Sequence, residues 1–215
     1  MTLSQKSRAG LLEVARRRGV TLIEAVLYIA IALALIIGGL VFYQQAALAQ
    51  RINSAVRNIS AMASETRALY QGQRNFTGFT QQTLIDAGAM PTSLMTDNGL
   101  RNEWGGTVRA GALTLDDGSN TTDNGFRIFY DAIPPEACAR LVAYDEDGVG
   151  LIGNGISEIR YRPTGSVDVY NQSIRRAGGV TAAEAALDCA SILTMNPSDP
   201  GDGSRRVDLS FLFRR

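Results

Sequence analysis

The sequence contains no histidine, and this absence removes the commonest general base and the commonest metal ligand of proteins. Only two cysteines are present, Cys138 and Cys189, which are too few for a zinc cage but suffice for one disulfide. No glycine-rich loop has the spacing that binds phosphate groups. We therefore expect no catalytic site, no cofactor and no metal, and we do not expect the chain to be an enzyme.

Charges of the two signs are balanced overall but unevenly placed. The 215 residues are 45% apolar and 20% charged, which is ordinary for a folded protein and leaves room for one domain with a core. Residues 1–19 carry five basic side chains and one acidic side chain, so the remainder holds 16 basic and 20 acidic groups. The basic excess is confined to the N-terminal end, and no nucleic-acid partner is indicated.

A long uncharged stretch follows the basic segment. No residue from Ala25 to Gln50 is charged, and residues 25–43 are almost wholly apolar. A helix of that length spans about 28 Å, close to the thickness of the hydrocarbon core of a bilayer. Because Arg16-Arg17-Arg18 lies just before this stretch, the positive-inside rule keeps that end in the cytoplasm. We expect a transmembrane helix over residues 25–43, with the rest of the chain on the other side.

One acidic residue, Glu24, stands at the start of this apolar stretch. An acidic group near hydrocarbon costs up to about 3 kcal/mol on insertion scales, so such residues usually have a function. The plainer alternative is that Glu24 merely stays at the membrane interface.

The run Gly19-Val20-Thr21-Leu22-Ile23-Glu24, with its basic leader and apolar helix, resembles the type III signal of type IV prepilins. The resemblance implies that a prepilin peptidase cuts after Gly19, that Val20 becomes the N-methylated first residue, and that Glu24 is the assembly residue. The 19-residue leader and a mature N-terminus other than phenylalanine are similar to the type IVb class. An ordinary secretory signal cut after Ala47-Leu48-Ala49 is the alternative, although the apolar run exceeds the usual length of such signals.

The helical pattern continues beyond the apolar stretch. Apolar residues recur at steps of three, four or seven along one stripe, which consists of Leu48, Ile52, Val56, Ile59, Met62 and Leu69. Arg57 and Arg67 are expected elsewhere on the surface of this helix. We expect a single helix over residues 20–72, capped by Gly72, whose first half is apolar all round and whose second half is amphipathic.

Residues 73–215 are expected to form a globular head, because short segments there alternate with Gly, Asn and Asp. The patterns predict a short helix at 80–87 and strands at 107–115, 126–130, 156–161 and 207–213. Pro134-Pro135-Glu136 and a capping box of Thr181 with Glu184 predict two helices that carry the cysteines. Since strands and helices do not alternate strictly, we expect an α+β fold with the long helix packed on a mainly antiparallel sheet.

Motifs in the head resemble the thin-pilus major pilins of conjugative plasmids and enteric bacteria: Asn102-Glu103-Trp104-Gly105-Gly106, a strand with Phe126 and Ile128, and Pro134-Pro135-Glu136-Ala137-Cys138. In that family the second cysteine closes a disulfide that bounds a variable surface region, a role that falls here on Cys189. Both cysteines are expected outside the cytoplasm, where thiols are oxidised. We expect a Cys138–Cys189 disulfide, with two buried free thiols as the alternative.

The resemblance implies a type IVb major pilin with the type IV pilin fold, made in the inner membrane of a Gram-negative-type bacterium and polymerised with copies of itself into an extracellular pilus. Its expected partners are prepilin peptidase and the inner-membrane assembly machinery. A minor pilin or type II secretion pseudopilin is one alternative function, and a secreted domain that does not polymerise is another. Pilins with this helix serve conjugation, adhesion, aggregation or motility, and the sequence does not choose among them.

Overall fold

The computed structural model describes residues 21–115, 122–145, 147, 149–153, 155–164, 174–195 and 206–214. The chain divides into two units, Met1–Gln45 and Ala46–Arg215. The expected leader at residues 1–19 and the expected first mature residue, Val20, lie outside the described residues.

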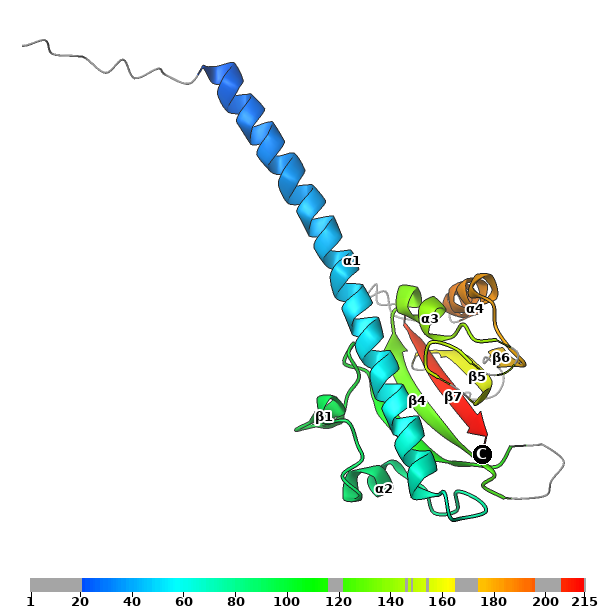
Figure 1. Cartoon of the computed structure of the whole chain (residues 1–215). Helices are drawn as coiled ribbons and strands as arrows, with labels where there is room; N and C mark the ends of the chain where they lie inside the picture. Colours follow the sequence, from blue (N-terminus) through cyan, green and yellow to red (C-terminus); the bar gives the residue numbers. More distant parts are fainter. Residues whose placement is uncertain are drawn as a thin grey trace, which may run out of the picture. The chain divides into compact units, whose positions relative to one another are not determined.

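Helix α1 (Leu22–Leu69) supplies residues to both units (Figure 1). Its 48 residues contain no proline, so no missing backbone N–H breaks the ladder of helical hydrogen bonds. The helix is shorter than the expected range 20–72. The N–H of Gln71 donates to the carbonyl of Ala68 at 3.3 Å, and this tighter turn ends the helix before Gly72 is reached.

Five antiparallel strands form the main sheet of the second unit in the order β3-β4-β7-β5-β6 (Figure 1). Their bounds are β3 (Val108–Leu113), β4 (Gly125–Ile133), β5 (Ile156–Pro163), β6 (Ile174–Ala177) and β7 (Val207–Arg214). The expected α+β fold with an antiparallel sheet is therefore confirmed. The last strand of the chain, β7, occupies the middle of the sheet, so the sheet is complete only when the C-terminal residues are in place.

Shorter elements surround this sheet: α2 (Gln81–Asp86), a 3₁₀ turn (Thr92–Leu94), the strand pair β1 (Met95–Thr96) and β2 (Gly99–Leu100), α3 (Pro135–Leu141) and α4 (Ala182–Met195). The predicted capping box of α4 is present, since Thr181 N–H donates to Glu184 Oε2 at 2.9 Å and Glu184 N–H donates to Thr181 Oγ1 at 3.3 Å. Strands β1, β2 and β6 were not predicted. They span two to four residues, which is too short to show an alternating pattern, and pairing with a partner strand holds them.

The core of the second unit lies between the second half of α1 and the facing side of the sheet. Ile59 and Met62 of α1 are fully buried, as are Phe126 of β4 and Phe213 of β7. Phe126 stacks on Phe213 with ring centroids 5.0 Å apart and contacts Phe76 edge-on at the same distance. Truncating one such buried aromatic ring to alanine typically costs about 3–5 kcal/mol, so this cluster is a main source of stability.

The buried stripe of α1 differs from the predicted one. Leu69 is 40% exposed, whereas Asn58 and Thr66 are buried. Arg67, expected on the surface, is half-buried, with its guanidinium carbon 5.3 Å from the ring centroid of Phe213. Burial lowers the pKa of Arg67. The prediction was wrong here because it counted apolar residues only. Asn58 finds hydrogen-bond partners in neighbouring loops, Thr66 donates to a carbonyl of its own helix, and Arg67 lies over aromatic rings of the sheet.

Candidate functional site

Glu24 lies in the first turn of α1, the negative side chain expected to be stabilised by the positive end of a helix dipole. Thr21 precedes the helix, and its side-chain oxygen accepts a 3.4 Å hydrogen bond from the Glu24 N–H. The hydroxyl of Tyr28, one turn further on, donates to Glu24 Oε1 at 3.4 Å. Both contacts are long, and the Glu24 side chain remains exposed.

Large apolar side chains cover the first part of α1 and are exposed over its whole circumference. Exposed fractions include 79% for Ile23 and 73% for Phe42, and none of the most apolar stretch of the helix is buried. Among the described residues, α1 is the one helix long and apolar enough to cross a membrane. Exposing so many apolar side chains to water is strongly unfavourable. This segment therefore needs lipid or other protein around it.

The two cysteines lie on neighbouring helices of the second unit. Cys138 of α3 and Cys189 of α4 form a disulfide across a Cα–Cα distance of 6.1 Å, so the predicted pairing is confirmed. Both side chains are buried in the core together with Leu141 and Ile192. The bond closes a loop of 51 residues, from α3 to the middle of α4.

Helix α4 is also held by an ion pair to the edge of the sheet. Arg176 of β6 donates from Nε and from one terminal nitrogen to the two carboxylate oxygens of Asp188, both at 2.8 Å. The Asp188 side chain is 6% exposed, so its carboxylate is shielded from solvent, whereas the Arg176 side chain is 41% exposed. The carbonyl of Arg176 in turn accepts a 3.1 Å hydrogen bond from the hydroxyl of Tyr144. The disulfide and this bidentate ion pair attach α4 to α3 and to β6 through two adjacent residues, Cys189 and Asp188.

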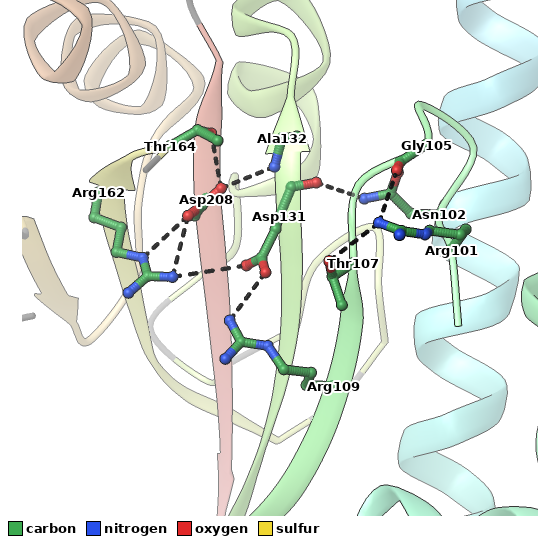
Figure 2. A network of polar contacts seen from close by, with 10 residues as sticks. All are labelled: Arg101, Asn102, Gly105, Thr107, Arg109, Asp131, Ala132, Arg162, Thr164 and Asp208. Carbon is green, nitrogen blue, oxygen red and sulfur yellow. Dashed lines mark hydrogen bonds and ion pairs between the residues drawn. The ribbon is translucent and has the colours of Figure 1, made fainter. Parts of the chain in front are cut away.

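A network of polar contacts holds an irregular segment of β4 (Figure 2). The pairing of β4 with β7 shifts between Tyr130 and Ile133, and Ala132 has a φ of +57° there. Asp208 Oδ1 accepts a 2.8 Å hydrogen bond from the Ala132 N–H and a 2.7 Å bond from the Thr164 hydroxyl, while Arg162 donates to Asp208 Oδ2 at 3.1 Å. Asp208 therefore stabilises a backbone conformation that alanine rarely adopts.

Asp131 lies beside Asp208 in the same network. It accepts a 2.9 Å ion pair from Arg109, and a terminal nitrogen of Arg162 lies 4.0 Å away (Figure 2). Burial raises the pKa of Asp131, the nearby carboxylate of Asp208 raises it further, and Arg109 acts in the opposite direction. The arginines thus offset the repulsion between two neighbouring carboxylates.

The Asn102–Gly106 motif attaches its loop to this bulge. Asn102 donates from Nδ2 to the carbonyl of Asp131 at 2.7 Å (Figure 2). Its Oδ1 accepts the N–H groups of Trp104 and Gly106 at 3.0 and 2.9 Å. A Cβ at Gly106 would overlap the Asp131 carbonyl oxygen. Gly105 has a φ of +81°, which favours glycine. Glycine is therefore required at residue 106 for steric reasons and favoured at residue 105 for its backbone conformation.

Glu103 of the same motif reaches the buried stripe of α1. Its Oε1 accepts a 2.7 Å hydrogen bond from Asn58 Nδ2, and Asn58 Oδ1 accepts a 3.0 Å bond from the Ser93 hydroxyl. Burial raises the pKa of Glu103, against the effects of its own backbone N–H, of the Asn58 hydrogen bond and of Arg57. Its Oε2 and the Tyr130 hydroxyl are both buried without a hydrogen-bond partner among the described residues. Only one of the two oxygens of this carboxyl is therefore satisfied.

The sequence patterns missed the roles of Asp208, Asp131 and Asn58. A usable signal existed for Asp208, because an aspartate inside the apolar run of β7 is unusual for a central strand. No local signal identifies Asn58, whose partners are 35 and 45 residues away in the sequence. Within the described ranges, no group of three or more acidic or cysteine side chains could hold a metal ion.

Three comparisons relate the chain to known proteins. Residues 49–191 match the model of the family described as PilS N terminal. The major structural subunits of the bundle-forming pilus of Escherichia coli O111:H- and O127:H6 are each 23% identical over 181 residues, which cover 83% of this chain and 91% of theirs. The crystal structure of a type IV b pilin from Salmonella typhi aligns with a TM-score of 0.47 and 24% identity, over 74% of this chain and 97% of that one.

Proposed function

The chain belongs to the PilS N terminal family, and on that premise we propose that it is the major structural subunit of a type IVb pilus. The observation that carries this proposal is the first part of α1, whose large apolar side chains are exposed on every side and whose one acidic residue is Glu24. A helix of this kind has two stable environments, the bilayer and the core of a polymer of identical helices.

In the proposed pathway, the precursor is held in the inner membrane by residues 25–43, with the head outside the cytoplasm. Prepilin peptidase then cuts after Gly19, and the new amine of Val20 is methylated. The subunit passes from the membrane to the growing fibre with the help of the inner-membrane assembly machinery. The basic leader before Gly19 supports this orientation.

The transfer of α1 from lipid to the fibre explains why a single charged residue has a large effect on assembly. Lipid tails are as apolar as leucine, so packing the apolar half of α1 against its copies gains little from the hydrophobic effect. Such packing also tolerates shifts along the helix axis. The apolar segment by itself therefore leaves the axial register between subunits poorly defined.

Glu24 can define that register. The cut frees a positive amine on Val20, four residues before Glu24, and both groups leave water when the helix enters the fibre core. Burying one unpaired charge costs several kcal/mol, and removing one partner of a buried pair costs about 3–5 kcal/mol. Pairing the amine with a Glu24 carboxylate, of a neighbouring subunit or of its own, removes that penalty. Pairing between subunits also selects the axial register of one helix against the next.

Electron microscopy of the producing cells tests the proposal. Cells that lack this chain should carry no such fibres. Restoring the chain should restore fibres, and an antibody against the head should label them along their whole length. Labelling at the tip alone would instead indicate a minor subunit. Unchanged fibres in the deletion strain would contradict the proposal.

A further inference from the structure

The side of the sheet opposite the core carries a row of polar and aromatic side chains that the proposed polymerisation does not use. The strand registers pair Arg109 with Phe129, Phe129 with Ser210, and Ser210 with Arg160. Since neighbouring strands lie about 4.8 Å apart, this row crosses four strands over roughly 14 Å. Side chains two residues away on the same strands, including Arg127 and Arg162, stand on the same side.

Two guanidinium groups contact the ring of Phe129. The guanidinium carbons of Arg109 and Arg127 are each 4.7 Å from the centroid of its ring. These cation–π contacts keep both cations close to the half-exposed ring.

A groove runs beside the ring along β7. Its floor is formed by Asp208 and Ser210 of β7, and its walls by Arg127 and Phe129 of β4 and by Arg160 and Arg162 of β5. The groove therefore has arginines on both walls and one carboxylate in its floor.

Ion pairs hold two of these arginines, Arg160 and Arg162, in place. Arg160 donates from Nε to Glu158 Oε1 at 2.6 Å and from one terminal nitrogen to Glu158 Oε2 at 3.4 Å. Among the described residues, no contact engages its other terminal nitrogen, which keeps two of the five N–H donors of a guanidinium. Asp208 is saturated by Arg162, Thr164 and Ala132. A ligand would therefore meet side chains that are already ordered, which lowers the entropy lost on binding.

We propose that this groove binds an acidic carbohydrate, with a sugar carboxylate between Arg127 and Arg160 above Ser210. The guanidinium groups would donate to the carboxylate, and Glu158 would accept hydrogen bonds from sugar hydroxyls. The ring of Phe129 offers an apolar surface to the C–H face of a sugar. These three side-chain types match the three kinds of group that such a sugar presents.

The mixture of charges favours a carbohydrate over DNA. Duplex DNA carries one negative charge per about 1.7 Å of its axis, and Glu158, Asp131 and Asp208 would repel so dense a polyanion. A polysaccharide with one carboxylate per sugar has far fewer charges along its length, and its hydroxyls suit the carboxylates. This site goes beyond the proposed structural function and does not depend on polymerisation, although a fibre would multiply a weak site into strong attachment.

The test uses the full chain solubilised in detergent and an oligogalacturonate, with binding followed by titration calorimetry. Arg127→Gln and Arg160→Gln should each weaken binding at least about tenfold. Arg140→Gln, which removes the same charge from the exposed surface of α3, is the matched control and should bind like wild type. Arg160→Lys keeps the charge but loses the planar pair of donors, so it should fall between wild type and Arg160→Gln.

Thermal unfolding of each variant separates a lost site from a lost fold. A loss of binding by Arg160→Gln at unchanged melting temperature supports the proposal. No binding by wild type at millimolar oligogalacturonate would overturn it. Equal losses in Arg127→Gln and Arg140→Gln would also overturn it, as would tighter binding of a 20-base-pair DNA duplex than of the oligogalacturonate.

Discussion

The two parts of helix α1 have the same backbone and opposite surroundings. In the first unit, large apolar side chains such as Ile23 and Phe42 are exposed all round the helix. In the second unit, Ile59 and Met62 are fully buried, and polar Asn58 and Thr66 occupy the same stripe with hydrogen bonds to their own unit. The second part of the helix finds its packing partner within the chain, whereas the first must find it in lipid or in other copies.

This difference predicts which changes affect assembly and which affect folding. Changes in the first part of α1 should abolish fibres and leave the head folded. Changes in the head should lower its free energy of unfolding and reduce fibres only as folded subunits are lost.

The largest expected effect comes from Glu24→Ala. Fibres should disappear under electron microscopy, because the amine of Val20 would have no carboxylate to pair with in the fibre core. The cut subunit should accumulate in the inner membrane, and the melting temperature of the head should not change. Glu24→Gln keeps the size of the side chain and removes the charge, so it should also lack fibres. Fibres at wild-type abundance in Glu24→Ala cells would show that assembly needs no such pair.

The disulfide should give the largest effect on the head. Replacing both Cys138 and Cys189 by serine releases a loop of 51 residues and should lower the free energy of unfolding by about 4 kcal/mol in the chain-entropy model. Denaturant unfolding of the solubilised chain, with and without reductant, measures this loss. Wild-type chain denatured without reductant should take up no thiol label, and two labelled cysteines would contradict the bond. Unchanged denaturation midpoints in the double variant would show that the bond contributes nothing to stability.

A smaller effect on stability is expected at the Asn102–Gly106 loop, which is hydrogen-bonded to the bulge of β4. Gly106→Ala puts a methyl group into the carbonyl of Asp131, so the loop or the strand must shift. We expect a loss of about 1–3 kcal/mol in the free energy of unfolding, as is usual for overpacking. Gly72→Ala is the matched control, because nothing lies within 4 Å of a Cβ built there. Equal midpoints for both variants in denaturant would refute the steric reading of the motif.

The smallest expected effect concerns Glu103. Because burial raises its pKa in the folded head, the folded state holds more protons than the unfolded state just above the ordinary pKa of a glutamate. The stabilisation is present at acid pH and is lost as the pH rises through the raised pKa. Glu103→Gln cannot ionise, so it should be more stable than wild type at neutral pH.

This advantage of Glu103→Gln should shrink as the pH falls below the ordinary pKa of a glutamate. Denaturation midpoints measured across the acid to neutral range test it, with the exposed Glu136→Gln as control. If Glu103→Gln lowered the free energy of unfolding at neutral pH, the change would have the opposite sign and the argument would be refuted.

Local sequence patterns predicted several main elements of the fold. The apolar run predicted α1, Thr181 and Glu184 predicted the start of α4, and the alternation at the C-terminus predicted β7. The same alternation placed Asp208 on an outer side of the strand, as observed, but gave no sign that it is 4% exposed and saturated with hydrogen bonds. Its partners come from a bulge 76 residues away and from the end of β5, and such pairs depend on tertiary structure that no local pattern contains.

The proposed assembly role of Glu24 has the opposite status. Its motif was identifiable from six consecutive residues, because the signal read by a peptidase has to be local. What its carboxylate contacts in a fibre depends on a second copy of the chain, so neither the sequence pattern nor a single subunit defines that contact.

The central claim, that the chain is a trimmed fibre subunit which keeps its apolar helix, is tested most directly by the intact mass of the subunit in purified fibres. The account predicts a chain that begins at Val20, carries one added methyl group, and is two hydrogens lighter than the reduced form. A chain that begins at Gln50, as an ordinary secretory signal would leave it, or an uncut chain that begins at Met1, would contradict the account.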